Sequence, residues 1–178
     1  MYLSIDIGVN NLGYTLSDAN LSVIQFGLFD ITEYSKKHYK KMDIVDSRCR
    51  SINDFFKTVT NENPLLGVII EKQTPNNIVA MSLMYAIFTA SLSYTSNVIL
   101  FDPKLKFTFT HESYTTLNKK HKKLSIKMAL DFLSNNPDLM SRFEQFTKKD
   151  DIADSLNQLI VYLKYIAQLT PLASLTYK

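Results

Sequence analysis

Residues 1–18 read MYLSIDIGVNNLGYTLSD, and this stretch decides how the rest of the chain is interpreted. Apolar residues alternate over YLSIDI, a turn follows at GVNN, and LGYTLSD resumes the alternation, so we predict two strands joined tightly. A third run, LSVIQFGLFDI at 21–31, extends the prediction to an antiparallel meander. Asp6 ends the first strand. A carboxylate there suits a metal ligand, the support of a phosphate loop or only a turn.

Helices and strands alternate in the remainder of the chain. Helical spacing of apolar residues predicts a helix over 43–60, and a helix over 76–93 is apolar on nearly every side. Between them, LLGVIIEKQ is a continuous apolar run, which is typical of a buried strand parallel to its neighbour. NVILFD, at 97–102, predicts a fifth strand.

Two more helices complete the prediction, one over 122–134, ended by NNP, and a long one at the C-terminal end. Thr147 and Asp150 resemble a capping box at the start of the last helix. Its apolar stripe consists of Ile152, Leu156, Leu159, Leu163 and Ile166. The order of elements predicts an α/β fold with a mixed sheet, antiparallel at one edge and parallel at the other.

Composition narrows the class of protein. The 178 residues, with 46% hydrophobic and 21% charged, suit a single domain over 1–178. The one cysteine, Cys49, excludes an internal disulfide and is typical of a reducing compartment. We find neither a secretory signal nor an apolar stretch long enough for a membrane span, so we expect a soluble intracellular protein without a membrane partner.

Positive charge is concentrated in one segment. Residues 103–127 contain seven lysines and one acid, Glu112, in a chain whose net charge is only +3. A local basic patch on a nearly neutral protein favours a polyanionic partner, although such a cluster is also common on ordinary solvated surfaces.

Acidic residues stand at matching places in the predicted fold. Asp6 ends the first strand, and Glu71 ends the fourth. If these strands are parallel neighbours, both carboxylates leave the sheet at the edge where open α/β sheets bind ligands. Asp151 and Asp154, in the first turns of the last helix, lie on one side of it and can reach the same edge. Acids at a helix start also have a simpler explanation in the helix dipole.

Carboxylates gathered this closely repel one another unless a cation lies between them. Oxygen ligands without histidine or cysteine suit Mg²⁺ or Mn²⁺. Two such ions about 4 Å apart can activate a water and stabilise the leaving oxygen in phosphodiester hydrolysis. The residues therefore favour a metal-dependent nuclease.

Three motifs in order, SIDIGVNNLGYTL, IIEKQ and KKDDIADSL, resemble those of Holliday junction resolvases of the RuvC type, above all the poxvirus resolvases. The resemblance covers nearly the whole chain and implies a ribonuclease H-like fold, a five-stranded mixed sheet with flanking helices. It also implies the site, with the family's four acidic ligands falling on Asp6, Glu71, Asp151 and Asp154.

The resemblance further implies a functional lysine before the last helix, for which Lys122 and Lys123 match better than Lys119 and Lys120. The last two, with Lys104 and Lys106, are then candidate DNA contacts. The bacterial members carry a glutamine directly after the glutamate, whereas here Lys72 separates Glu71 from Gln73.

The resulting hypothesis is an endonuclease that resolves four-way DNA junctions and branched replication intermediates by symmetric metal-dependent hydrolysis, with about two Mg²⁺ or Mn²⁺ ions per site. The alternatives are a ribonuclease H-type or flap nuclease and a non-catalytic module that binds branched DNA. A kinase or ATPase of the actin-like fold would need a second glycine-rich loop and a longer chain. The resemblance also implies a homodimer, for which we favour the apolar helix at 76–93, and the host-cell cytoplasm as location.

Overall fold

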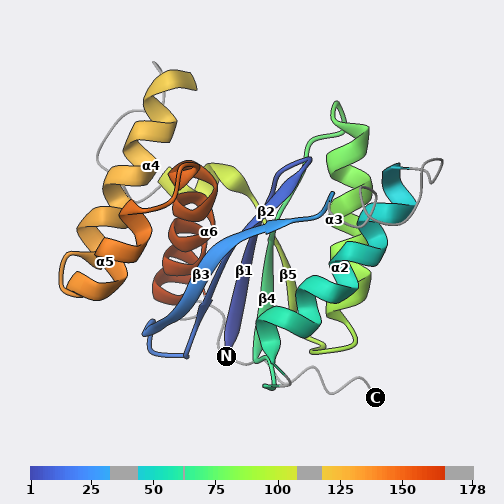
Figure 1. Ribbon diagram of the computed structural model, residues 1–178, viewed down its shortest axis with the longest axis horizontal. Helices are drawn as coiled ribbons and strands as arrows, with labels where there is room; N and C mark the ends of the chain where they lie inside the picture. Colours follow the sequence, from blue (N-terminus) through green and yellow to red (C-terminus); the bar gives the residue numbers. More distant parts are fainter. Residues whose placement is uncertain (33–43, 62, 108–117, 167–178) are drawn as a thin grey trace.

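The computed structural model describes residues 1–32, 44–61, 63–107 and 118–166, and its centre is a five-stranded sheet (Figure 1). The strands, in the spatial order β3-β2-β1-β4-β5, are β1 (Tyr2–Ile7), β2 (Asn11–Ser17), β3 (Val23–Asp30), β4 (Gly67–Glu71) and β5 (Val98–Phe101). The pairs β1–β2 and β2–β3 are antiparallel, while β1–β4 and β4–β5 are parallel. The predicted mixed sheet is confirmed.

Helices cover both faces of this sheet (Figure 1). One face carries α2 (Ile44–Thr60) and α3 (Ile78–Ser91). On the other face α6 (Lys149–Val161) packs on the strands, and α4 (Asn118–Leu133) and α5 (Pro137–Glu144) pack around it. None of the helices in the described ranges is both long and apolar enough to cross a membrane.

The structure corrects the predicted helices in three places. The helix predicted from residue 122 begins at Asn118, and α5 was not predicted at all. NNP ends one helix, but Asn136 also caps the next, accepting a bond from the Leu139 N–H, with Pro137 in its first turn. The predicted capping box at Thr147 does not form, because Lys148 occupies the cap position of α6 and makes no side-chain cap bond.

The C-terminal stripe is otherwise placed as predicted. Ile152, Leu156, Leu159 and Leu163 are all buried, while the side chain of Ile166 lies outside the described residues. The chain changes from α-helix to a π-helical turn, Tyr162–Ile166, within this stripe. That 1–178 forms one domain stays a prediction.

Alternation along the central strands sends successive residues to opposite faces of the sheet. Leu3, Ile5 and Ile7 of β1 belong to the core formed with α2 and α3, as do Val68 and Ile70 of β4. The residues between them face α6, since Ser4 accepts a hydrogen bond from Gln158 Nε2 at 3.1 Å, and Ile69 packs in a cluster with Leu159. Asp6 and Glu71 continue this second, α6-facing series.

Buried polar contacts hold α6 against the sheet. Thr15 Oγ1 of β2 and Ser155 Oγ share a hydrogen bond of 2.8 Å. Besides Ser4, the amide of Gln158 donates to the Ile69 carbonyl at 3.1 Å. Hydrogen bonds are directional, so these contacts fix both the height and the rotation of α6 on the strands.

Gly13 lets α6 approach this closely. A Cβ at Gly13, which lies opposite Asp6 in the β1–β2 pair, would stand 2.3 Å from the backbone carbonyl oxygen of Asp151. No real Cβ contact is this short, and the opposing atom is backbone, which cannot turn away. The start of α6 therefore requires glycine at this position.

We expect Gly13→Ala to lower the free energy of unfolding by about 1–3 kcal/mol, the range for overpacked sites, because α6 must shift. Gly27→Ala on β3 is the matched control, since its Cβ would meet the end of the Tyr14 side chain at 3.0 Å. Urea denaturation compares the two variants. Equal stability of the two would contradict the role given to Gly13.

Candidate active site

The site is at the carboxyl ends of β1 and β4. These parallel strands pair Ser4 with Ile69 and Ile5 with Ile70, so the register continues to Asp6 and Glu71. Both carboxylates leave the sheet side by side on the α6 face. Asp6 is buried, with 8% of its surface exposed, and Glu71 is half-buried. The two acids predicted from strand geometry therefore do lie together.

Asp154 of α6 and Lys106 complete the cluster. Lys106 belongs to a short 3₁₀ turn, Pro103–Phe107, that directly follows β5. Its Nζ lies 2.9 Å from Glu71 Oε1, 3.6 Å from Asp154 Oδ1 and 3.8 Å from Asp6 Oδ1. One ammonium is thus shared by three carboxylates that come from three separate elements.

The position of Lys106 differs from the sequence prediction, which placed it among surface DNA contacts. Only 3% of its surface is exposed. The signal that identifies it is topological, because PKLKF follows the fifth strand at the same sheet edge where Asp6 and Glu71 end. Lys106 is one of seven lysines in residues 103–127, so the sequence pattern alone does not distinguish it from the other lysines of this basic segment.

Asp154 is oriented by a polar network between α4 and α6. Ser125 Oγ donates to Asp154 Oδ1 at 2.6 Å. Asn157, one turn further along α6, donates through Nδ2 to both Ser125 Oγ and the Ser125 carbonyl at 2.9 Å. Sequence reasoning missed Ser125, because nothing in the sequence shows which residue of α4 faces the acids.

Asp151 and Asp150 lie where α6 begins. Asp151 is half-buried, and its backbone carbonyl rests against Gly13, the cross-strand neighbour of Asp6. Asp150 instead forms an ion pair with Lys122 of α4. At the edge of the site, Asp151 therefore lies next to the β1–β2 hairpin, and Asp150 lies next to α4.

The predicted lysines occupy different surroundings. Lys122 is mostly exposed apart from its pair with Asp150, and Lys123 is exposed on the next position of α4. Lys104 is exposed on the 3₁₀ turn that carries Lys106. Lys119 and Lys120 are in the first turn of α4, but their side chains lie outside the described residues.

Burial and mutual repulsion divide the protons of the cluster unevenly. Burial, and then the neighbouring Glu71 carboxylate, raises the pKa of Asp6 well above its usual range. Burial would also raise the pKa of Glu71, but the Lys106 ammonium and hydrogen bonds from Asp6, Lys106 and Gln73 lower it. Burial raises the pKa of Asp154, against the effects of Lys106 and Ser125, and it raises the pKa of Asp151.

Gln73 therefore contacts the site although it is displaced by one residue from the bacterial pattern. Its Nε2 donates to Glu71 Oε2 at 3.2 Å. Since β4 ends at Glu71, the chain beyond it is free to bring the second following residue, rather than the first, back to the carboxylate.

The donor set suits a hard divalent cation in its chemistry, because all its ligands are carboxylate oxygens. Its present spacing is that of an ammonium site. Within the residues that the structure describes, no three histidine, cysteine, aspartate or glutamate side chains are arranged to hold a metal ion. The carboxylates are chemically suited to a divalent metal ion. Their oxygens, however, are arranged around the Lys106 ammonium, at 2.9–3.8 Å from its Nζ.

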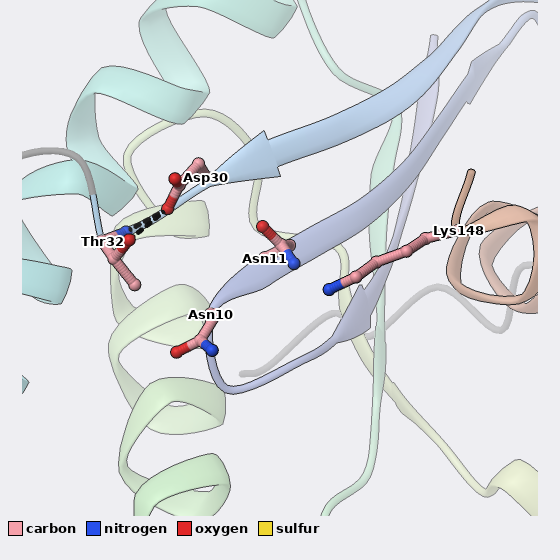
Figure 2. Close-up of a pocket in the computed structure, with 5 residues that line it drawn as sticks. All are labelled: Asn10, Asn11, Asp30, Thr32 and Lys148. Atoms are coloured by element: carbon pink, nitrogen blue, oxygen red, sulfur yellow. Dashed lines mark hydrogen bonds between the residues drawn. The ribbon is translucent and has the colours of Figure 1, made fainter. Parts of the chain in front are cut away.

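A polar pocket of about 440 Å³ lies beside the turn that follows β1 (Figure 2). Its lining residues are Asn10, Asn11, Asp30, Thr32 and Lys148. Figure 2 shows the Lys148 side chain extending from the start of α6 toward Asn11 of β2. Lys148, another residue that sequence reasoning missed, thus places an amine next to the turn between β1, which carries Asp6, and β2, which carries Gly13.

Comparison with solved structures gives three close likenesses in fold. The fowlpox virus resolvase, solved with its substrate Holliday junction DNA, has a TM-score of 0.64 at 24% identity, over 95% of this chain and 99% of that one. Thermus thermophilus RuvC with a Holliday junction substrate gives 0.61 at 13%, over 95% and 96%. The yeast mitochondrial Holliday junction resolvase gives 0.56 at 13%, over 95% and 86%. The predicted ribonuclease H-like fold is confirmed.

Among curated protein sequences, none is significantly similar to this chain. A family model does match it. The model describes the poxvirus A22 protein and aligns with residues 1–168. This span contains every acidic residue of the cluster and confirms the poxvirus resemblance that the three sequence motifs indicate. The chain belongs to the poxvirus A22 protein family.

Proposed function

We propose that this protein is a structure-selective endonuclease that resolves four-way DNA junctions by metal-dependent hydrolysis. The observation that carries the proposal is the convergence of Asp6, Glu71 and Asp154 at one sheet edge in a member of the poxvirus A22 family. The fowlpox virus resolvase and Thermus RuvC were both solved with Holliday junction DNA, which supports the choice of substrate. The poxvirus family supports the host-cell cytoplasm as its place of action.

Asp6, Glu71, Asp151 and Asp154 would hold Mg²⁺ or Mn²⁺, in our proposal two ions per site. When bound, the metal supplies an activated water and charge stabilisation for the phosphodiester being cut. The protein supplies rigid placement, since Asp6 and Glu71 are fixed by paired strands and Asp154 by Ser125. No side chain has to form a covalent intermediate.

Lysines around this edge would bind the DNA backbone. Lys104 extends the site along the 3₁₀ turn, and Lys148 extends it along the hairpin pocket. Lys122 or Lys123 of α4 would stabilise the negative charge that develops on the phosphate, as preorganised cations do at such sites. Lys119 and Lys120 stay predictions as DNA contacts.

We propose in addition that the protein acts as a homodimer, because two symmetric cuts in a four-way junction require two active sites. The apolar helix α3 exposes two large side chains, Ile78 at 76% and Tyr85 at 55%. Tyr85 also lines a groove of about 560 Å³ between α2 and α3. This face lies across the sheet from the acids, so dimerisation through it would leave both sites open.

Asp6→Asn should bind a four-way junction normally and lose cleavage. Altering a group that merely supports a metal ligand costs about 10–100-fold, so altering the ligand should cost more than about 100-fold. Asp131→Asn, an exposed aspartate of α4, makes the same charge change as a control. Gel-shift and cleavage assays with Mg²⁺ measure the two properties separately.

The same assays on an RNA–DNA hybrid and a flap distinguish the alternative nucleases. If the protein cuts the RNA–DNA hybrid or the flap faster than the junction, the proposed specificity for four-way junctions is wrong. Cleavage retained in Asp6→Asn would refute the site, and junction binding without any cleavage by the wild type would favour the non-catalytic module.

Ser125→Ala tests the orientation of Asp154. The variant loses the 2.6 Å bond to the carboxylate, so we expect cleavage to fall about 10–100-fold while junction binding stays unchanged. Ser134→Ala, beyond the end of α4, is the control, because the Ser134 hydroxyl donates to the nearby Asp131 carbonyl rather than to an acid of the cluster. Equal rates for both variants would remove Ser125 from the mechanism.

Tyr85→Glu tests the dimer, because a charge in an apolar interface is left without a partner. We expect wild type to have the mass of a dimer and the variant that of a monomer by light scattering. Ile24→Glu, which changes an exposed apolar residue of β3, should remain dimeric. A dimeric Tyr85→Glu would place the interface elsewhere.

A further inference from the structure

Lys106 is a buried lysine whose ammonium lies among three carboxylates. A lysine with 3% of its surface exposed is rare unless it is paired, and here the Lys106 ammonium pairs with three acids of the candidate metal site. Removing a charge from such a cluster leaves its partners buried and uncompensated. Lys106 therefore offsets the repulsion among Asp6, Glu71 and Asp154, which the strands and α6 bring together.

The same ammonium occupies the space that a metal ion would need. Mg²⁺ binds oxygen at about 2.0–2.1 Å, whereas the carboxylate oxygens stand 2.9–3.8 Å from Lys106 Nζ. A cation at the centre of these oxygens would collide with the ammonium and repel it. The described residues accordingly include no set of three or more histidine, cysteine, aspartate or glutamate side chains arranged to hold a metal ion.

We propose that Lys106 is an internal cation that competes with the divalent metal: its ammonium fills the carboxylate cluster in the metal-free protein and leaves the cluster when the metal binds. The inference rests on the proposed function only in placing the metal among Asp6, Glu71 and Asp154. A flexible stem of four methylene groups links the ammonium to the backbone, so it can turn out of the cluster without movement of the sheet.

Two consequences follow for the binding of metal. Each binding event must expel Lys106, so the apparent affinity is lower than the carboxylates alone would give. A site that is open for a tenth of the time binds about ten times more weakly. Without metal, the Lys106 ammonium offsets the repulsion among the carboxylates and so stabilises the folded protein, as the metal does when it is bound.

Lys106→Met keeps an unbranched side chain, one heavy atom shorter, and removes its charge. We expect it to bind Mn²⁺ about tenfold more tightly in calorimetric titration. In metal-free buffer its melting temperature should fall by about 6–20 °C, and saturating Mn²⁺ should restore most of that loss. Lys127→Met, an exposed lysine of α4, makes the same change in net charge and should alter neither quantity. Unchanged or weaker Mn²⁺ binding by Lys106→Met would overturn the proposal.

Amine labelling of the wild-type protein provides a test that does not depend on the variant folding. Reductive methylation followed by mass spectrometry should modify Lys106 slowly in metal-free buffer and at least about tenfold faster with saturating Mn²⁺, while Lys127 reacts equally in both. Protection of Lys106 that persists with Mn²⁺ bound would show that the ammonium stays in the cluster, and would refute the competition.

Junction cleavage, measured in parallel, separates this inference from the proposed function. Tighter Mn²⁺ binding by Lys106→Met in a protein that cuts no junction would support the competition and reject the resolvase. Junction cleavage by a wild type whose Lys106 stays protected with Mn²⁺ bound would support the resolvase and reject the competition.

Discussion

Like charges crowded into a poorly solvated edge of the sheet are the constraint around which this molecule is organised. Asp6, Glu71 and Asp154 are brought within reach of one another by strands and a helix that are distant in sequence, and their mutual repulsion opposes that packing. Lys106 offsets it, and the raised pKa of Asp6 beside the lowered pKa of Glu71 shows how unequally the remaining charge is shared. Bringing these carboxylates together therefore costs folding free energy at this edge of the sheet.

The position of α6 on the sheet is closely fixed, and this determines where Asp154 lies in the cluster. An apolar helix face alone would allow small sliding and rolling on the strands, because dispersion contacts have little directionality. Thr15, Ser155 and Gln158 replace part of that contact with buried hydrogen bonds, and Gly13 removes the side chain that would keep the helix at a distance. The same helix that completes the core therefore also aims Asp154, and Ser125 from α4 supports its carboxylate.

Much of this could be predicted from the sequence, for reasons that are local. Alternation in residues 2–17 and the unbroken apolar run before Glu71 gave the sheet, and the parallel pairing of β1 with β4 put Asp6 beside Glu71. Residues whose role depends on the approach of distant elements were missed. Lys106 was hidden in a lysine-rich segment, Ser125 had no local signal, and the short helix α5 was lost because NNP ends one helix and starts another. Whether the remaining lysines bind DNA stays a prediction.

The hydrogen bonds between α6 and the sheet also restrict how this sequence can drift over evolutionary time. One residue gained or lost between Asp154 and Gln158 would turn the carboxylate by about 100° relative to the amide that seats the helix. Substitution at exposed positions of α6 leaves that relation intact, but a change in length does not. In distant relatives the spacing within this helix should therefore persist after most of its identities have changed, so that alignment gaps are confined to the loops around it.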